Sequence, residues 1–596
     1  MTKSKIAGFD REQVLAPLVI GITGHRDIRE EDRQVLEHKV KEIFLQFRKD
    51  YSATPLILLS ALAEGADRLA AKVAVSPEVG VRLVVLVPMP IDLYLLDFDS
   101  ISVLGTPLGT AAANSSSREE FRALLDKAYT RFELGLVDGE EWETIAKPGP
   151  ERDRQYELVG KYIAQQSQIL IALWDGVDSN RVGGTASVIH FQTGGVPGPD
   201  PCALEAPEGF PVYHILTPRL TNPYPQGEVL SLRTIYPKVF QGNQAHAHEY
   251  YGKMFGRLNE FNRYITHADR GLDNKVIESK NYLLQNMRED ELPAGMGSAL
   301  NRYAVADALA IRFQKRLFWA QVLLHVGTFS AFLCFLLFVD LKDYQLYFLA
   351  ASGILSIGVG VLRILSGKWA LDTQHEDYRA MAEGLRVKFF WKLAGITESV
   401  ADHYLGKQRS ELDWIRNGFR GWNVGESPQN HEKLDSLDGE DQRNRLEFVR
   451  KYWIHHQQRY FHRAAKRNLK YHELIERLGN ICVGAVVVLG LVLLFLCVRN
   501  IELHRGLAVI GLEALLAAAA LLHHFNNRMA YAEYKKQYDR MDSLFARGSD
   551  LLGKFLKSQD YKNASRCVKK VGIEALTENG DWVFLRRERP VEVPHP

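Results

Sequence analysis

The chain has 596 residues, enough for several domains, and its 74 basic residues nearly balance its 72 acidic ones, for a formal charge of +2. This balance gives no reason to expect binding to a nucleic acid polymer. Five cysteines without a C-x-x-C pair exclude a zinc ribbon and disfavour a disulfide scaffold, so we expect no metal site and a reducing cytosol around the soluble parts.

Short apolar runs alternate with helical stretches in the N-terminal third of the chain. The runs are near-continuously apolar, as strands covered on both faces must be. They lie at residues 18–22, 56–59, 81–87, 169–174 and 212–216. Alternation of this kind predicts an α/β fold with a doubly wound parallel sheet, and such sheets bind ligands at the carboxyl ends of their strands.

The first two runs end in segments that carry polar and glycine residues. The first ends in GITGHRD, in which Thr23 and Gly24 allow a tight turn and His25 and Arg26 add hydrogen-bond donors for an anion. The second ends in SALAEGADRLA, residues 60–70. There we predict that Gly65 permits a close approach, that Glu64 and Asp67 accept from ribose hydroxyls, and that Arg68 pairs with phosphate.

A third segment of this type follows the run at 169–174. It begins with Asp175 and continues to two glycines and a threonine before a helix, Gly183, Gly184 and Thr185, which can cradle a phosphate. Taken singly, each of the three segments is better explained as a plain turn with solvated charges. Because the exits of parallel strands share one edge of a sheet, the three together predict one ligand site.

The C-terminal half contains four segments long and apolar enough to span a membrane, at 317–339, 345–365, 481–498 and 506–523. The alternative for each is a buried core helix of a large soluble protein. Basic residues gather before the first and third segments and after the second and fourth, which predicts both termini in the cytosol and a multi-pass protein of the inner membrane.

The two pairs of spans are followed by similar sequences, YRAMAEGLR at 378–386 and YDRMDSLFAR at 538–547, which indicates a duplicated two-span unit. Ser352 and Ser356 lie on one face of the second span, where close helix packing is favoured over lining a pore. Glu513 lies inside the fourth span, and it either faces a pore or reaches the membrane surface.

Two family resemblances follow from these motifs. GITGHR at 21–26, AEGADR at 63–68, residues 152–176 and GGTA at 183–186 together resemble the SLOG superfamily, a Rossmann-like group. That resemblance implies binding of a nucleotide-derived ligand, either ADP-ribose-like or a cyclic or linear oligonucleotide, with no further cofactor. Related hydrolases carry a glutamate three residues after the threonine of the glycine motif, and Val188 stands there instead, so the resemblance implies a sensor more than an enzyme.

The second resemblance is to SLATT membrane effectors, two-span proteins associated with bacterial nucleotide-triggered defence, and it is carried by residues 375–395 and 453–465. It implies a homo-oligomer that opens a pore in the lipid bilayer when a nucleotide second messenger binds. The alternatives are a membrane-tethered nucleotide hydrolase that uses Glu64, and a transporter or membrane scaffold.

These expectations divide the chain into six parts. They are a SLOG-like domain at 1–225, a helical coupling segment at 226–310, a first two-span unit at 311–420, a linker and cytosolic helix at 421–465, a second two-span unit at 466–560 and a tail at 561–596. The mixed apolar and charged residues at 582–593 predict a terminal strand.

Overall fold

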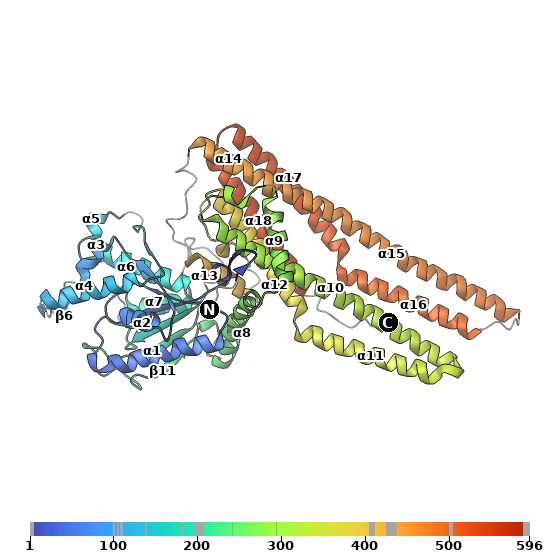
Figure 1. The fold of residues 1–596 in the computed structure, drawn as a ribbon, viewed down its shortest axis with the longest axis horizontal. Helices are drawn as coiled ribbons and strands as arrows, with labels where there is room; N and C mark the ends of the chain where they lie inside the picture. The colour runs from blue at the N-terminus through green and yellow to red at the C-terminus, as the bar shows by residue number, and fades with distance from the viewer. Residues whose placement is uncertain are drawn as a thin grey trace. The chain divides into compact units, whose positions relative to one another are not determined.

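The computed structural model describes residues 5–98, 102–103, 106–107, 111–137, 140–178, 182–196, 208–240, 242–285, 287–293, 295–404, 412–424, 438–499 and 505–587. The chain forms two compact units (Figure 1). Unit 1 combines Met1–Ala268 with Ser399–Glu432, and unit 2 combines Asp269–Glu398 with Lys433–Pro596. This division differs from the expected boundaries, because unit 1 continues past residue 225 and takes in a later segment of the chain.

Unit 1 contains a seven-stranded sheet in which every neighbouring pair is parallel except the pair formed by Val212–Leu216 and Leu232–Ile235. Its spatial order is β11 (Leu232–Ile235), β10 (Val212–Leu216), β9 (Ile169–Trp174), β3 (Leu18–Gly24), β4 (Leu56–Ser60), β5 (Arg82–Val87) and β8 (Thr130–Glu133). The α/β architecture predicted from the apolar runs is therefore confirmed, with β8 and β11 added at the two edges.

The order of the strands creates a switch point between β3 and β9. From β3 the chain proceeds outward through β4, β5 and β8, and it then returns to the other side of β3 for β9 and β10. The loops that leave β3 and β9 therefore run in opposite directions across the sheet. In open α/β sheets, a crevice for ligands lies at this place, outside the carboxyl ends of the strands.

Helices cover both faces of the sheet. On one face, Val159 and Ile163 of α6 (Pro150–Gln166) and Val188 of α7 (Thr185–Gly194) pack in one apolar core with the strands. On the other face, Phe47 of α1 (Glu30–Asp50) contacts Tyr213 of β10 with ring centroids 5.2 Å apart. The remaining described elements of unit 1 include α2 (Ala66–Ala74), α3 (Ile91–Tyr94), α4 (Ala111–Asp126), α5 (Trp142–Ile145), α8 (Gln244–Thr266) and α13 (Asp413–Val424), with the short strands β1 (Lys5–Ile6), β2 (Phe9–Asp10), β6 (Ser102–Val103) and β7 (Thr106–Pro107).

Two helices distant in sequence hold the segment that enters β3. Asn262 of α8 pairs with both the amide and the carbonyl of Ala16, at 2.8 Å each. The Trp422 indole of α13 donates to the Leu15 carbonyl at 2.9 Å. The linker expected from residue 421 thus begins inside a buried helix, and residues 425–437 lie outside the described part of the chain.

Unit 2 is helical. Its helices are α9 (Arg270–Leu284), α10 (Met296–Asp340), α11 (Gln345–Lys368), α12 (Leu371–Leu393), α14 (Gly439–Val449), α15 (His455–Val498), α16 (Arg505–Met529), α17 (Tyr531–Lys557) and α18 (Tyr561–Arg587). A π-helical turn at Arg450–Ile454 joins α14 to α15. Residues 582–587 belong to α18, so the terminal strand predicted from residue 582 is wrong over the described residues.

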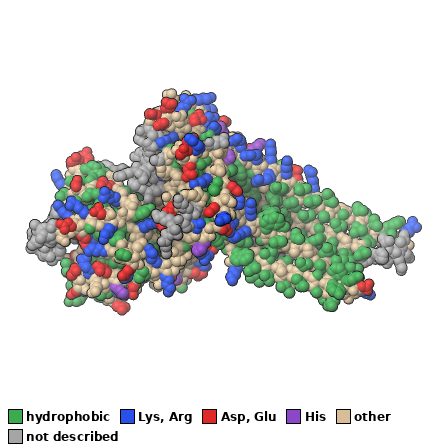
Figure 2. All heavy atoms as spheres, in the orientation of Figure 1, with side chains coloured by type: hydrophobic (Ala, Val, Ile, Leu, Met, Phe, Trp, Pro, Cys, Tyr) green, Lys and Arg blue, Asp and Glu red, His purple; other side chains and the backbone are tan. Residues whose placement is uncertain are grey.

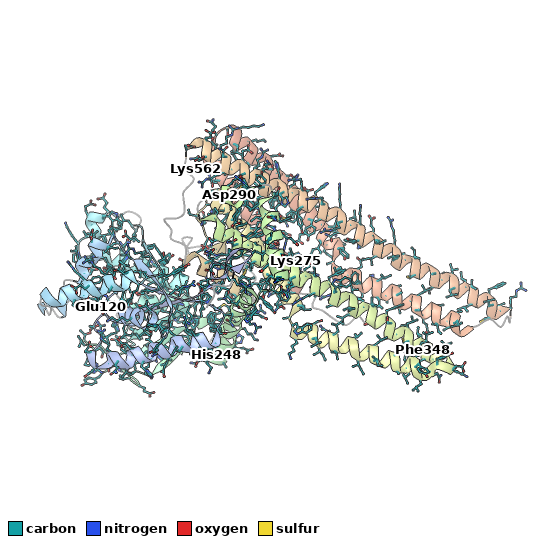
Figure 3. All side chains as sticks on the ribbon, in the orientation of Figure 1. Glu120, His248, Lys275, Asp290, Phe348 and Lys562 are labelled. Carbon is teal, nitrogen blue, oxygen red and sulfur yellow. The ribbon has the colours of Figure 1, made fainter. Side chains whose placement is uncertain are left out.

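Four helical segments of unit 2 are long and apolar enough to cross a membrane. α10 has 45 residues and so extends about 68 Å, roughly twice the thickness of a hydrocarbon core. Figure 2 shows an almost continuous hydrophobic surface over these helices, bordered by Lys and Arg side chains. Phe348 marks the apolar hairpin end of α11, whereas Lys275, Asp290 and Lys562 lie on polar parts of unit 2 (Figure 3).

The duplicated two-span unit has the same local structure in both copies. α11 and α12 are separated by Ala370 in a left-handed conformation (φ 46°), and α16 and α17 by Ala530 in the same conformation (φ 52°). Tyr378 packs on Phe313 at 5.5 Å, and Tyr538 packs on Phe461 at 5.6 Å. Each exit helix is therefore attached to the lead-in helix of its own hairpin by an equivalent aromatic pair.

Candidate functional site

The segments that leave β3, β4 and β9 meet at the carboxyl edge of the sheet. A Cβ added to Gly24 would lie 2.4 Å from the Ala66 Cβ and 2.6 Å from the Leu173 carbonyl oxygen. Gly65 has φ +75°, and a Cβ there would lie 2.4 Å from the carbonyl oxygens of both His25 and Arg26. The two glycines therefore serve contacts between the segments themselves, which only residues without a side chain allow.

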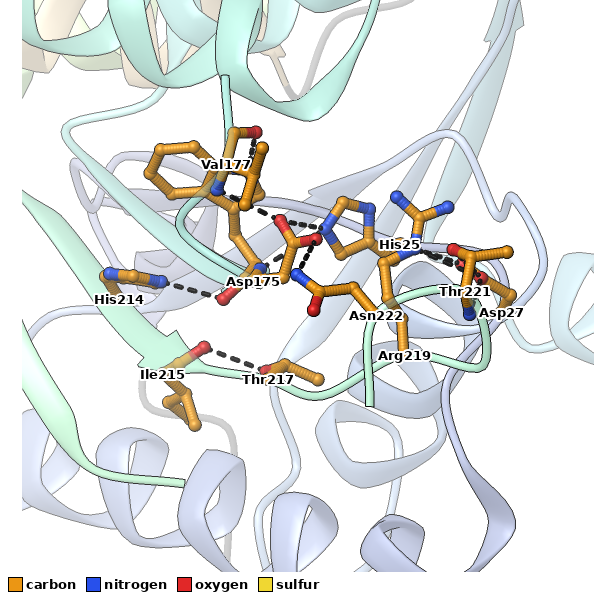
Figure 4. Close-up of polar contacts among 11 residues, drawn as sticks. His25, Asp27, Asp175, Val177, His214, Ile215, Thr217, Arg219, Thr221 and Asn222 are labelled. Carbon is orange, nitrogen blue, oxygen red and sulfur yellow. Dashed lines mark hydrogen bonds and ion pairs between the residues drawn. The ribbon is translucent and has the colours of Figure 1, made fainter. Parts of the chain in front are cut away.

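His25 and Asp175 join β3 to β9 across the switch point. The His25 Nε2 lies 3.0 Å from Asp175 Oδ1 and 3.2 Å from the Asp175 amide nitrogen (Figure 4). The Nε2 atom cannot both donate to the carboxylate and accept from the amide. Because an ionised carboxylate can only accept, we assign the ring proton to Nε2, which then donates to Asp175 Oδ1. The Nδ1 of His25 then carries a lone pair.

Different effects keep His25 neutral and Asp175 ionised. Burial, reinforced by Arg219, lowers the pKa of His25 despite the nearby Asp175, so the imidazole is neutral at pH 7. Burial alone would raise the pKa of Asp175, but hydrogen bonds from the Asn222 amide and the Val177 backbone lower it. Asp175 is therefore an ionised carboxylate that orients a neutral histidine.

A second polar group follows β10 and was not predicted. The Arg219 Nε donates to both carboxylate oxygens of Asp27, at 2.9 and 3.0 Å, and the Thr221 hydroxyl donates to the same carboxylate at 2.9 Å. In Figure 4 the Arg219 guanidinium lies beside the His25 ring. Its two terminal nitrogens make no hydrogen bond with the residues that the structure describes.

The signal for this group is present in the sequence. TPRLTN, residues 217–222, directly follows the apolar run of β10 in the same way that GITGHRD ends β3. Leu220 donates its amide to the Asp27 carbonyl at 2.9 Å, so the two exits are joined. The rule that located the first three segments would have located Arg219, Thr221 and Asn222 as well.

Three side chains after β4 that were predicted to contact the ligand bond other protein groups instead. The buried Asp67 carboxylate accepts from the Ser60 hydroxyl at 3.2 Å, and the Glu64 carboxylate accepts from the Ser117 hydroxyl. Arg68 is 2% exposed, and its guanidinium bonds the Leu62 carbonyl, Ser117 and Glu120 of α4 (Glu120 is labelled in Figure 3). These contacts give Asp67 and Arg68 a role in fixing the turn, in place of the predicted contacts with ribose and phosphate.

Burial dominates the titration of Asp67. It raises the pKa of this carboxyl to about 6, although hydrogen bonds from Ser60 and the Ala63 backbone oppose the shift. The raised pKa therefore reports a sequestered structural group, and it does not by itself identify a catalytic acid.

The glycine motif after β9 lies at the start of α7. Gly183 has φ +71°, and a Cβ added there would lie 3.0 Å from the Glu157 amide nitrogen of α6. Gly184 is the N-cap of α7, and Thr185 is the first residue of that helix. Val188 is buried and would lie 2.7 Å from a Cβ on Gly160 of α6. The position of the expected catalytic glutamate is thus an apolar contact between α6 and α7.

Arg26 is the exposed cation of the rim. Its guanidinium carbon lies 5.8 Å from the centre of the Tyr156 ring, and it forms no ion pair within the described residues. The Tyr156 hydroxyl donates to Asp97, which Arg152 also binds at 2.8 Å. Tyr156 is therefore held in place, while Arg26, next to Thr23, Gly24 and His25 in sequence, keeps its charge available.

The three span residues predicted as pore candidates lie in different surroundings. Ser352 of α11 is buried and donates to the Ala331 carbonyl of α10 at 2.9 Å, which supports the packing role. Ser356 of α11 and Glu513 of α16 are exposed, as far as the described residues show.

Two further polar side chains of the spans were not predicted as site residues. Gln321 and His325 are buried on α10, and the His325 ring lies 5.4 Å from the His524 ring of α16. The two histidine rings therefore bring the hairpins into contact within the spans.

Comparison with known proteins places no family on the chain. No family model matches it, and a search of curated proteins finds no relative. In the part of the chain that the structure describes, no three His, Cys, Asp or Glu side chains are grouped as metal ligands.

Proposed function

We propose that this protein is a membrane effector gated by a nucleotide signal, in which a SLOG-like unit 1 binds the ligand and SLATT-like spans of unit 2 form a pore in an oligomer. The observation that carries the proposal is the meeting of the β3, β9 and β10 exits at the switch point, with His25, Arg26 and Arg219 around it, in a chain that also has four span-length helices.

The chemistry of this rim suits a phosphate-bearing ligand. Arg26 and the terminal nitrogens of Arg219 are guanidinium donors, and two such groups match the oxygens of a phosphate or diphosphate. The neutral His25 adds no charge but offers its Nδ1 to a ribose hydroxyl. An ADP-ribose-like molecule and a cyclic or linear oligonucleotide both combine these groups.

The order of the chain provides covalent routes from the rim to the spans. The chain passes between the two units three times, at 268/269, 398/399 and 432/433. The segment between the second and third passages contains α13, which holds the start of β3 through Trp422, and it separates the two hairpins in sequence. A ligand that changes the packing of β3 can therefore act on both hairpins, provided that it binds one state better than the other.

The experiment is an ion-flux assay with the full chain in dye-loaded liposomes. ADP-ribose, a cyclic dinucleotide and a linear oligoadenylate are added in turn, with AMP as the control. We expect flux with one of the signals and none with AMP, and the flux should vanish in Arg219→Ala. Liposomes that stay ion-tight with every signal, although calorimetry shows binding, would reject the pore and keep the sensor.

One observation favours a second function, nucleotide hydrolysis. His25 is neutral, oriented by Asp175, and has a lone pair on Nδ1, which is the arrangement of a general base. Turnover of a nucleotide that disappears in both His25→Gln and Asp175→Asn would support hydrolysis, whereas binding without turnover supports the sensor.

A further inference from the structure

A polar cavity lies inside unit 2, among its helices. Its volume is about 130 Å³, and its walls come from α10, α12, α15, α17 and α18. These are the lead-in and exit helices of both hairpins, together with the final helix of the described chain. Any group that changes charge in this cavity acts on both two-span units at once.

An ion-pair network occupies one side of the cavity. Arg379 of α12 binds Asp307 of α10 at 3.3 Å and Glu383 at 2.5 Å, and Arg386 binds the same Glu383 at 2.7 Å. Arg386 also donates to the Tyr303 hydroxyl at 2.9 Å. The two guanidinium groups are thus matched by two carboxylates, and the network is neutral without any further acid.

Glu578 of α18 is the additional acid. Its side chain borders the cavity and has no hydrogen-bond or ion-pair partner among the described residues. The titratable and charged groups that face it are His375, Arg379 and Glu383 of α12, Tyr460 of α15, Tyr538 and Arg540 of α17, and Asp581 of α18. An ionised Glu578 would therefore be the unmatched charge of a neutral cluster.

We propose that the cavity is a proton-binding site: Glu578 carries a proton while α18 is packed against α12 and α17, and release of that proton to water loosens α18 and the junction of the two hairpins. The proposal needs no nucleotide and concerns a different part of the chain from the rim.

The electrostatics of the cluster agree with the geometry. Burial, reinforced by Glu383, raises the pKa of Glu578 from 4.5 to about 8 against the opposing effect of Arg379. Because the folded pKa is raised, the folded state is most favoured below the unfolded value of 4.5 and loses stability as the pH rises toward 8. His375 adds no charge in this range, since burial lowers its pKa to about 3.

The helix that carries Glu578 is well placed to act as a bridge. Ala394, the C-cap of α12, accepts from the Ser565 hydroxyl at 3.2 Å, and Asp377 of α12 pairs with Arg587, so both ends of α18 are attached to the first hairpin's exit helix or its cap. A Cβ added to Gly548 of α17 would lie 2.7 Å from the Val571 side chain, so α17 and α18 are in close contact there. Loosening α18 would therefore separate the exit helices of the two repeats.

The test is thermal unfolding of the full chain in detergent between about pH 6 and pH 9, for the wild type, Glu578→Gln and Glu574→Gln. Glu574 is exposed on the same helix and is the matched control. We expect the wild-type Tm to fall by about 3 °C or more across this range, Glu574→Gln to follow it, and Glu578→Gln to stay level.

Hydrogen exchange gives a second measurement that does not depend on global unfolding. After correction for the intrinsic pH dependence of exchange, peptides of residues 561–587 should lose protection from pH 6 to pH 9 in the wild type and keep it in Glu578→Gln. The proposal is overturned if Glu578→Gln retains the wild-type pH dependence, or if the wild type shows none in either measurement.

Discussion

Carboxylates are buried both at the rim of the sheet and in the cavity of the helical bundle, and they are held in opposite charge states. At the rim, Asp27 and Asp175 have lowered pKa values because Arg219, Asn222 and backbone amides outweigh the effect of burial. In the bundle, Glu578 has no such partner, and its pKa is raised. The carboxylates of Asp27 and Asp175 are therefore fixed anions, whereas Glu578, like the buried Asp67 of unit 1, has a raised pKa and holds its proton to a higher pH.

This difference separates two ways of building a responsive site. Partners that fix the charge of Asp27 and Asp175 leave the neighbouring His25 and Arg219 oriented for a ligand, so the rim is preorganised. In the bundle, an acid without a partner leaves the charge of the cavity dependent on the pH of the solution. The rim should thus respond to a ligand and the bundle to rising pH, and each prediction below tests one side of that contrast.

The largest effect is expected from Gly65→Ala. The new methyl group would lie 2.4 Å from two carbonyl oxygens, at a φ of +75° that an L-residue rarely adopts, so we expect a loss of about 3 kcal/mol or more in unit 1. Chemical unfolding monitored by hydrogen exchange of β3 and β4 measures it. Gly256→Ala in α8, where nothing lies within 4 Å, is the control and should be neutral or slightly stabilising. An unfolding midpoint equal to that of the wild type would contradict the packing role of Gly65.

Arg219→Ala should have the next largest effect, on ligand binding. It removes guanidinium donors and leaves Asp27 with Thr221 as its one side-chain partner among the described residues. We expect affinity for whichever of ADP-ribose or the oligonucleotides binds to fall about 30-fold. Isothermal titration calorimetry measures the loss. Arg33 is a partly exposed arginine of α1 that pairs with Glu30, and Arg33→Ala should bind as the wild type does. Unchanged affinity in Arg219→Ala would move the ligand site away from the switch point.

The outcome at the rim shows which parts of a site a sequence can predict. Strand exits follow from apolar runs and their order, so the convergence of Gly24, Gly65 and Asp175 could be predicted. The direction of each side chain could not, because it depends on neighbours from other parts of the chain: Arg68 turns inward to meet Ser117 and Glu120 of α4. The sequence prediction covered the exits of the first, second and late strands and omitted the exit of β10, which carries Arg219.

The fold, too, has features that the sequence predicts and features that it does not. Hydropathy predicted the four spans, since a helix in lipid must satisfy its own backbone. The buried α13 was divided between the first two-span unit, which was expected to end at residue 420, and a linker from residue 421, because its polar residues hide a tertiary role. Arg416 and Arg420 of α13 both pair with Glu208, a contact between segments more than 200 residues apart that no local pattern reveals.

Glu513→Gln tests the spans and should change conductance by several-fold without changing ligand affinity. Glu513 is exposed on α16, and a carboxylate within a span is stabilised by water or by a second copy of the chain, so its charge should attract cations to a pore. Single-channel recording measures the change. Equal conductance and equal cation selectivity would place Glu513 at the membrane surface instead.

The opposite pH responses of the two units provide a smaller effect. Burial lowers the pKa of His25 below 6.5, so the folded rim disfavours the protonated form: its stability is complete above pH 6.5 and is lost as the pH falls. Exchange protection of β3 and β9 should therefore decrease on acidification below pH 6.5, where α18 becomes better protected. His25→Gln should weaken the acid response of β3 and leave α18 unchanged; an acid response equal to that of the wild type would assign it to another group.

The smallest effect is expected from the serines of α11, and it distinguishes packing from pore lining. Ser352→Ala removes the 2.9 Å bond to the Ala331 carbonyl and should cost about 0.6 kcal/mol of hairpin stability, the usual size of an interhelical bond in a membrane. Ser356→Ala is the matched control, since Ser356 is exposed one turn further along the same helix. Stability in detergent and conductance in bilayers should separate the two: Ser352→Ala lowers the first alone, while Ser356→Ala changes only the second if its face lines the pore. A conductance change in Ser352→Ala with full stability would reverse the assignment, because it would show that the Ser352 hydroxyl contributes to the pore and not to the packing of the hairpin.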